Sequence, residues 1–81
     1  MEQVKLIWDF RGPNAKQIAE HHVIHLKEFA DRENISAEIC TTELVSEMYC
    51  MAYWVVDKIY MNDLRERLKP HRGQRFQKDL T

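Results

Sequence analysis

The sequence predicts one α+β domain over residues 1–81, with elements in the order β-α-β-β-α and then a short edge strand or basic tail over residues 70–81. Three observations carry this prediction. Apolar residues alternate with polar ones over residues 4–10, recur at helical spacing over residues 15–33, and return as a continuous apolar stretch over residues 48–57. A core of this size contributes only ~3–5 kcal/mol to the free energy of unfolding, so such domains are commonly stabilised further by cross-links or by oligomerisation.

The first strand is marked by apolar residues at every second position, namely Val4, Leu6, Trp8 and Phe10. Gly12 and Pro13 end it, and proline in a first turn suits the start of a helix. The helix over residues 15–33 carries an apolar stripe with charged residues on its other side, and Asn34 suits its end. The stripe consists of Ala15, Ile18, Ala19, Leu26, Phe29 and Ala30.

A hairpin is expected between residues 35–42 and 48–57, but no glycine-containing turn joins them, so the register of the hairpin stays open. Asp57 can cap a second helix over residues 58–68, which Pro70 ends. Right-handed crossovers then give a four-stranded antiparallel sheet with both helices on one face.

The third strand is apolar on both faces. One face carries Tyr49, Met51, Tyr53 and Val55, and the other carries Cys50, Ala52, Trp54 and Val56. Because two helices cover only one face of the sheet, the other face would be a large exposed apolar patch without a partner. The simplest partner is a second copy, so we expect a homodimer.

The element order, together with Ala52-Tyr53-Trp54-Val55-Val56-Asp57 leading into a leucine-containing helix, resembles the ferredoxin-like proteins that pair sheet to sheet as dimeric α/β barrels. The resemblance covers nearly the whole chain and implies a ferredoxin-like βαββα(β) fold. Proteins of this type include small isomerases, cofactor-free monooxygenases, haem-related enzymes, and many binding or regulatory proteins. The resemblance transfers no catalytic residue to this chain, and it leaves the activity open.

The composition is that of a globular protein, with 44% hydrophobic and 31% charged residues, which excludes disordered and low-complexity classes. No apolar run approaches the ~20 residues of a membrane span and no leader is present, so we expect a cytoplasmic protein without a membrane partner. Cys40 and Cys50 lack metal-ligand spacing and are too few for a disulfide framework, which predicts free thiols. They would lie opposite each other only if the hairpin were centred on Val45.

Histidines are concentrated in the middle of the first helix. His21 and His25 lie four residues apart on one flank and supply two ligands, one short of what a zinc site usually takes from protein, so we expect no metal and no cofactor. His22 falls inside the apolar stripe, where a buried imidazole needs a hydrogen-bond partner such as Asp9, a tyrosine hydroxyl or a backbone carbonyl. His22 is therefore either a satisfied core residue or a catalytic base with a pKa suited to proton transfer.

A ligand pocket is expected between the first helix and the sheet, next to His22. Its other lining residues would be Trp8, His25 and either Tyr53 or Trp54, depending on which face the third strand turns toward the helix. Arg11, just before a helix N-terminus, would bind a small anionic ligand such as a carboxylate or a phosphate.

Charge is unevenly distributed, since residues 1–57 carry a net charge of −5 and residues 58–78 carry +5. Three function classes remain open. The first is a small dimeric protein that binds a ligand or regulates. The second is a cofactor-free isomerase or monooxygenase in which His22 is the base and Arg11 holds an anionic substrate. The third is an RNA-binding protein that uses the basic end, and we rank it last because a dimer would cover the sheet aromatics. That end contains Lys69, His71, Arg72, Arg75 and Lys78.

Overall fold

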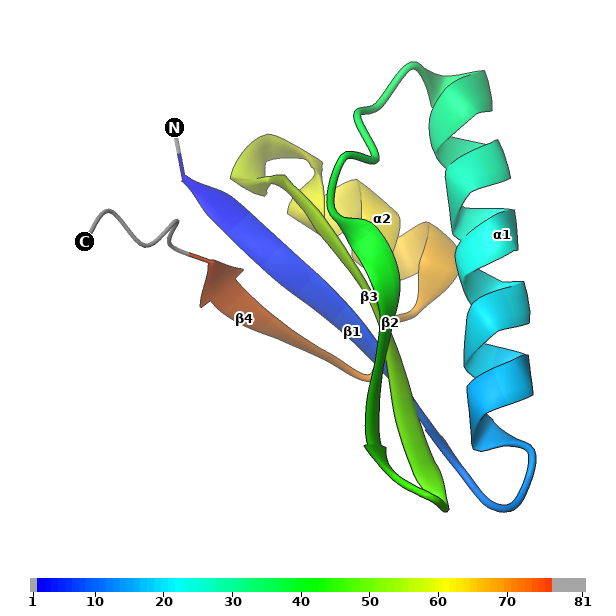
Figure 1. The fold of residues 1–81 in the computed structure, drawn as a ribbon. Coiled ribbons are helices and arrows are strands. Elements are labelled where there is room, and N and C mark those ends of the chain that lie inside the picture. The colour runs from blue at the N-terminus through cyan, green and yellow to red at the C-terminus, as the bar shows by residue number, and fades with distance from the viewer. Residues whose placement is uncertain (1, 77–81) are drawn as a thin grey trace.

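A four-stranded antiparallel sheet carries two helices on one face (Figure 1) in the computed structural model, which describes residues 2–76. The elements in chain order are β1 (Gln3–Arg11), α1 (Ala15–Glu33), β2 (Cys40–Ser46), β3 (Tyr49–Asp57), the short 3₁₀ helix η1 (Lys58–Tyr60), α2 (Met61–Leu68) and β4 (Arg72–Phe76). The sheet order is β2-β3-β1-β4 and every neighbouring pair is antiparallel. The predicted α+β class is confirmed, and the element order is consistent with the ferredoxin-like arrangement. Lys78 and the rest of the predicted tail beyond residue 76 lie outside the described residues.

Helix α1 begins and ends where the sequence predicts. Gly12 turns the chain out of β1 with φ 116°, a conformation that favours glycine. At the other end Asn34 adopts the left-handed conformation with φ 57°, and its backbone N–H donates to the carbonyls of Ala30 and Asp31. The predicted stripe is buried except at Ile18, which is 48% exposed, because α1 turns this position away from the sheet.

The β2–β3 hairpin differs from the prediction. β2 begins at Cys40 rather than at residue 35, and a two-residue turn at Glu47 and Met48 joins it to β3. The register shifts between Leu44 and Ser46, so Val45 is the extra residue of a β-bulge, which lets a tight turn form without glycine.

This register separates the two cysteines. Cys40 lies opposite Trp54, whereas Cys50 lies opposite Leu44, so the thiols do not face each other. Both are buried and free, as predicted. Burial raises the pKa of the Cys40 thiol to about 11.

The second helical segment is shorter than predicted and starts as a 3₁₀ turn. Asp57 precedes this turn, but its side chain makes no capping hydrogen bond among the described residues, so the predicted cap is wrong. Helix α2 ends at Leu68, where Lys69 takes a left-handed conformation and Pro70 follows. With eight residues and Leu64 as its one buried side chain, α2 covers less of the sheet than α1 does.

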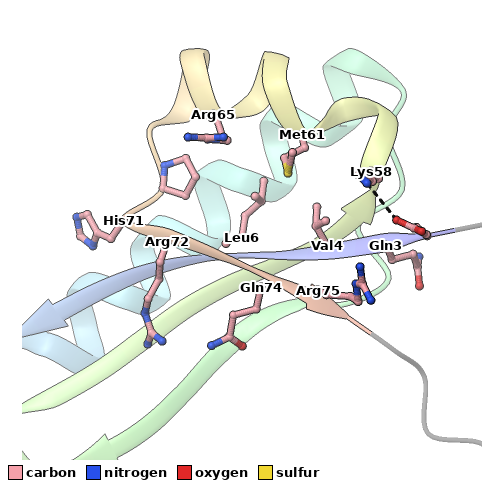
Figure 2. Close-up of a pocket in the computed structure, with 13 residues that line it drawn as sticks. Gln3, Val4, Leu6, Lys58, Met61, Arg65, His71, Arg72, Gln74 and Arg75 are labelled. Atoms are coloured by element: carbon pink, nitrogen blue, oxygen red, sulfur yellow. Dashed lines mark hydrogen bonds and ion pairs between the residues drawn. The ribbon is translucent and has the colours of Figure 1, made fainter.

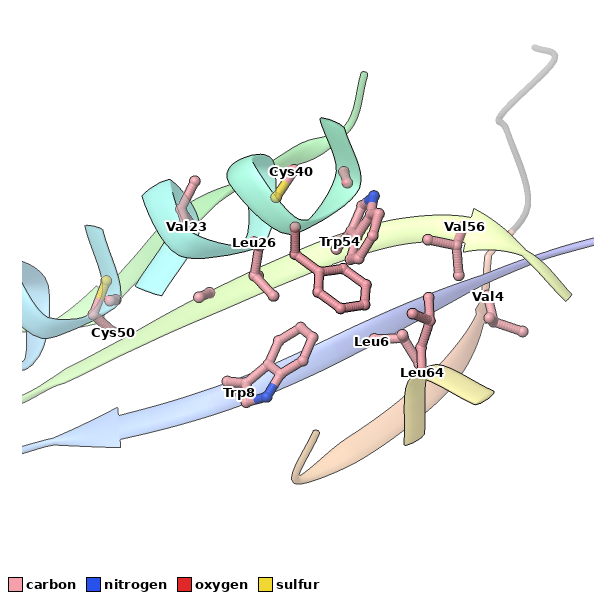
Figure 3. Packing of buried hydrophobic residues seen from close by; sticks show 14 of the residues in the cluster. Val4, Leu6, Trp8, Val23, Leu26, Cys40, Cys50, Trp54, Val56 and Leu64 are labelled. Atoms are coloured by element: carbon pink, nitrogen blue, oxygen red, sulfur yellow. The ribbon is translucent and has the colours of Figure 1, made fainter. Parts of the chain in front are cut away.

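The core lies between the sheet and the two helices (Figure 3), and two tryptophans are at its centre. Trp54 is fully buried and Trp8 is 3% exposed. Each indole N–H finds an acceptor, since Trp54 Nε1 donates to the Ser36 carbonyl at 2.9 Å and Trp8 Nε1 donates to the Leu68 carbonyl at 3.0 Å. These two hydrogen bonds connect core tryptophans to the segment after α1 and to the end of α2.

The face of the sheet without helices is not the exposed apolar patch that the sequence predicts. Ile7, Met51 and Val55 on this face are only 1%, 8% and 5% exposed. Long side chains from neighbouring strands lie on this face, since Arg72 reaches across to Met51 and Lys5 Nζ lies 4.1 Å from the centre of the Tyr53 ring. Within residues 2–76, the large apolar side chains that are exposed are Ile18, Ile24, Ile39, Leu44, Val45, Met48 and Ile59.

Within residues 2–76, no helix combines the length and the apolar character that crossing a membrane requires.

Candidate functional site

His22 lies where its place in the apolar stripe predicts, on α1 against the first strand. Its ring centre is 4.8 Å from that of Trp8 and 5.5 Å from that of Phe10. Nε2 is buried without a hydrogen-bond partner among residues 2–76, so the expected partner is wrong. Asp9 cannot serve, because its carboxylate points to the opposite face of the sheet and binds Arg72.

Burial lowers the pKa of His22, and the positive charges of His25 and His71 lower it further. The ring is therefore neutral near pH 7. A general base must also reach the proton that it abstracts, and a buried Nε2 packed between aromatic rings does not reach open solvent. Nε2 of His22 thus has a packing environment, whereas the residue as a whole is partly exposed.

The other predicted site residues are distributed over three regions. Trp8 and Trp54 are in the core, His25 is exposed on α1, and Tyr53 and Arg11 are on the open face of the sheet. Arg11 lies over the Tyr49 ring at 4.0 Å from its centre. Of the predicted set, Trp8 and His22 have their rings in contact, and Trp8 and Trp54 belong to the same core cluster.

A polar network occupies the open face instead. Arg72 donates from Nε and Nη2 to the two carboxylate oxygens of Asp9, each at 3.0 Å, and from Nη2 to the Tyr49 hydroxyl oxygen at 3.1 Å. The Tyr49 hydroxyl in turn donates to Asp9. The Arg72 hydrogen bonds hold the pKa of Asp9 below its usual value, whereas the hydrogen bond to Asp9 raises the pKa of Tyr49. The network therefore fixes an ionised aspartate on this face.

A groove lies between the helical segment and the edge of the sheet (Figure 2), with a volume of about 410 Å³. Its apolar part consists of Val4, Leu6, Met61, Pro70 and Gly73, and its polar part includes Glu2, Lys58, Arg65, His71 and Arg75. In Figure 2, Met61 and Arg65 extend from the helical side, while Arg72 and Gln74 turn to the other face of the sheet. This volume lies within the range of about 300–1,000 Å³ that is typical of small-molecule sites.

The groove exists because α2 is short and because β4 carries a glycine beneath it. Gly73 pairs with Leu6 of β1, and a Cβ added at Gly73 would meet nothing closer than 3.8 Å, from Leu6 Cδ2. A side chain there would therefore occupy the groove without a backbone clash. Glycine at this position leaves the space open to a ligand.

Positive charge lies toward both ends of the groove, with Lys58 and Arg75 at one end and Arg65 at the other (Figure 2). Lys58 Nζ lies 3.2 Å from Glu2 Oε2, and its hydrogen bond lowers the pKa of that carboxyl, as does the charge of Arg75. Within residues 2–76, neither Arg65 nor Arg75 makes an ion pair. The groove thus already holds one carboxylate and keeps two further cations for another anion.

The sequence pointed to part of this groove, because His71 and Arg75 belong to the basic end. It did not single out Lys58, Met61 and Arg65 as site residues. These three recur at helical spacing on one side of the second helical segment, and this spacing was the available signal. That they face β4 follows only from the tertiary structure.

Searches of protein-family models, of curated proteins and of solved structures found no match to this chain.

Proposed function

We propose that this protein is a small ligand-binding or regulatory protein that takes a small anion with an apolar group in the groove between α2 and β4. The observation that carries the proposal is the combination of an apolar floor with Arg65 and Arg75, two cations that make no ion pair within residues 2–76. An apolar group would contact Val4, Leu6 and Met61, while a carboxylate or phosphate would lie near the cations.

The test is calorimetric titration with octanoate, octyl phosphate and inorganic phosphate. We expect the two amphipathic anions to bind and inorganic phosphate to bind more weakly, because the apolar floor contributes only to the former. Removing both cations with Arg65→Gln and Arg75→Gln should weaken binding by about tenfold, since each partly exposed ion pair contributes up to about 1 kcal/mol. Arg32→Gln, in the last turn of α1, is the matched control and should leave the affinity unchanged.

Two further variants distinguish binding in the groove from general electrostatic attraction of the anion to the protein. Gly73→Val should abolish binding without unfolding the protein, because the new side chain occupies the groove and valine favours a strand. Glu2→Gln should strengthen binding, because it removes the carboxylate that Lys58 now holds. Binding that survives Gly73→Val unchanged would place the ligand elsewhere and overturn the proposal.

We also propose that two copies pair through the open sheet face as a dimeric α/β barrel. The charge distribution supports this pairing. A two-fold axis parallel to the strands would place β2 of one copy over β4 of the other. Glu43 of β2, which is on the open face opposite Met51, then approaches the basic strand that carries Arg72. Equilibrium sedimentation should give a dimer at micromolar concentration, and Tyr53→Glu should give monomers. A wild-type monomer at 100 micromolar would contradict the pairing.

The two remaining function classes have distinct outcomes in these experiments. Turnover of a bound anion that is lost in His22→Asn would support an enzyme. Salt-sensitive binding of single-stranded RNA that is lost in the Arg72→Gln, Arg75→Gln variant would support an RNA-binding protein. The structure favours ligand binding, because Arg72 is engaged by Asp9 and Nε2 of His22 is buried.

We place the protein in the cytoplasm. The buried free thiols of Cys40 and Cys50 support a reducing compartment.

A further inference from the structure

The two histidines on the outer face of α1 lie closer together than their spacing requires. His21 Nε2 and His25 Nε2 are 2.9 Å apart, and the two rings meet edge to face with centres 4.5 Å apart. Without a metal, one ring donates its N–H to the other. This contact places both Nε2 atoms where a single ion could bind them together, remote from the groove between α2 and β4.

The separation of the two nitrogens is that of a hydrogen bond, and it can be compared with the ligand geometries that different metals prefer. With metal–nitrogen bonds of about 2.05 Å, nitrogens 2.9 Å apart subtend an angle of about 90° at the metal. A tetrahedral ion would require a separation of about 3.3 Å at the same bond length. An angle near 90° fits adjacent positions of a tetragonal or square-planar ion, the geometry of Cu²⁺ and Ni²⁺, and Cu²⁺ is the more strongly bound of the two.

Glu28 supports His25 in this role. Its Oε1 lies 3.3 Å from His25 Nδ1, on the far side of the ring from His21. A carboxylate that accepts the Nδ1 proton fixes the tautomer in which Nε2 presents its lone pair to a metal. His21 reaches the same tautomer by moving its proton to Nδ1, so both Nε2 atoms can present a lone pair to one ion.

We propose that His21 and His25 form a two-histidine site for Cu²⁺, with Glu28 as the residue that orients His25. Within residues 2–76 no group of three or more histidine, cysteine, aspartate or glutamate residues is arranged to hold a metal, so water completes the coordination. The site is independent of the ligand groove and does not require the proposed dimer.

The experiment is a titration of the full chain with Cu²⁺ at pH 7.5, with glycine present as a weak competitor, followed by calorimetry and by the visible absorption of the bound ion. We expect one strong site, weaker binding of Ni²⁺ and Zn²⁺, and loss of at least tenfold in affinity in His21→Asn and in His25→Asn. Glu28→Gln should lose about tenfold, the lower limit for a residue that orients a metal ligand.

A relocated pair gives the matched control. Gln17 lies one turn before His21 on the same exposed flank, so the double variant Gln17→His, His25→Asn rebuilds a pair with the same spacing. It should bind Cu²⁺ more tightly than His25→Asn alone but about tenfold more weakly than the wild type, because Ile24 takes the place after His21 that Glu28 takes after His25. Circular dichroism should show an intact helix in every variant, because the substituted side chains are exposed.

The proposal is overturned if the wild type takes up no Cu²⁺ under these conditions. It is also overturned if the double variant His21→Asn, His25→Asn binds Cu²⁺ within twofold of the wild type. Equal affinity would assign the metal to other groups of the chain.

Discussion

Replacing His22 by phenylalanine should stabilise this protein. Nε2 of His22 is buried without a hydrogen-bond partner in the described chain, and such an atom costs about 1–3 kcal/mol. A phenyl ring at this position keeps the contacts with Trp8 and Phe10, whose ring centres lie 4.8 and 5.5 Å away. The larger ring offsets part of the gain, so we expect a net stabilisation of about 1 kcal/mol.

Urea unfolding at pH 7.5, followed by circular dichroism, measures this difference directly, and the thermal midpoint should rise by about 4–8 °C. His25→Phe is the matched control on the same helix. Because the His25 side chain is 61% exposed, the free energy of unfolding should change by less than about 0.5 kcal/mol. A loss of 1 kcal/mol or more in His22→Phe would show that the imidazole has a partner in solution and would refute the reasoning.

The pH dependence of the same variant provides a second check. Burial lowers the pKa of His22 in the folded protein below its ordinary value of 6.5, so the unfolded chain binds its proton first as the pH falls. The wild type therefore loses stability below about pH 6.5, until the pH reaches the folded pKa. His22→Phe lacks this loss, and its advantage over the wild type should widen between pH 7.5 and pH 5.

Three other predictions follow from the contacts. Arg72→Gln should destabilise the fold by about 1 kcal/mol at pH 7, because it removes two charged hydrogen bonds to Asp9. Since the pKa of Asp9 is lowered in the folded protein, this difference in the free energy of unfolding should vanish as the pH falls through that pKa. Urea unfolding from pH 7 to pH 2 measures it. Trp54→Phe should cost about 2 kcal/mol in the same assay, because it leaves a void and frees the Ser36 carbonyl, and a change below 0.5 kcal/mol would contradict the assigned core. Cys40, with a thiol pKa of about 11, should react with a thiol reagent at pH 8 only after denaturation, and fast labelling of the native protein would contradict its burial.

The elements that the sequence predicts well are those whose signals are local. Helix α1 begins after Gly12 and ends before Asn34 because each of these residues supplies an unusual backbone conformation. The alternating strand β1 and the apolar strand β3 are likewise encoded in their own residues. The hairpin register is different, because the bulge at Val45 depends on how two strands pair and has no glycine to mark it.

The candidate site depended on contacts between distant segments, and this is why the sequence predicted little of it. The apolar stripe placed His22 correctly but did not show which groups of β1 lie opposite its ring. Nor did the apolar residues of β3 reveal that Lys5 and Arg72 would lie on the same face. The groove itself arises where α2 stops short of covering Gly73, a relation between two elements that neither encodes alone.

An NMR titration tests whether the groove between α2 and β4 is the ligand site. With octyl phosphate added to the uniformly ¹⁵N-labelled protein, we expect the backbone amide shifts of Leu6, Met61 and Gly73 to move and those of Ile24 and Leu44 to stay in place. These last two side chains are exposed apolar residues outside the groove. Shifts concentrated at Ile24 and Leu44, or no shifts at millimolar ligand, would contradict a ligand site in the groove.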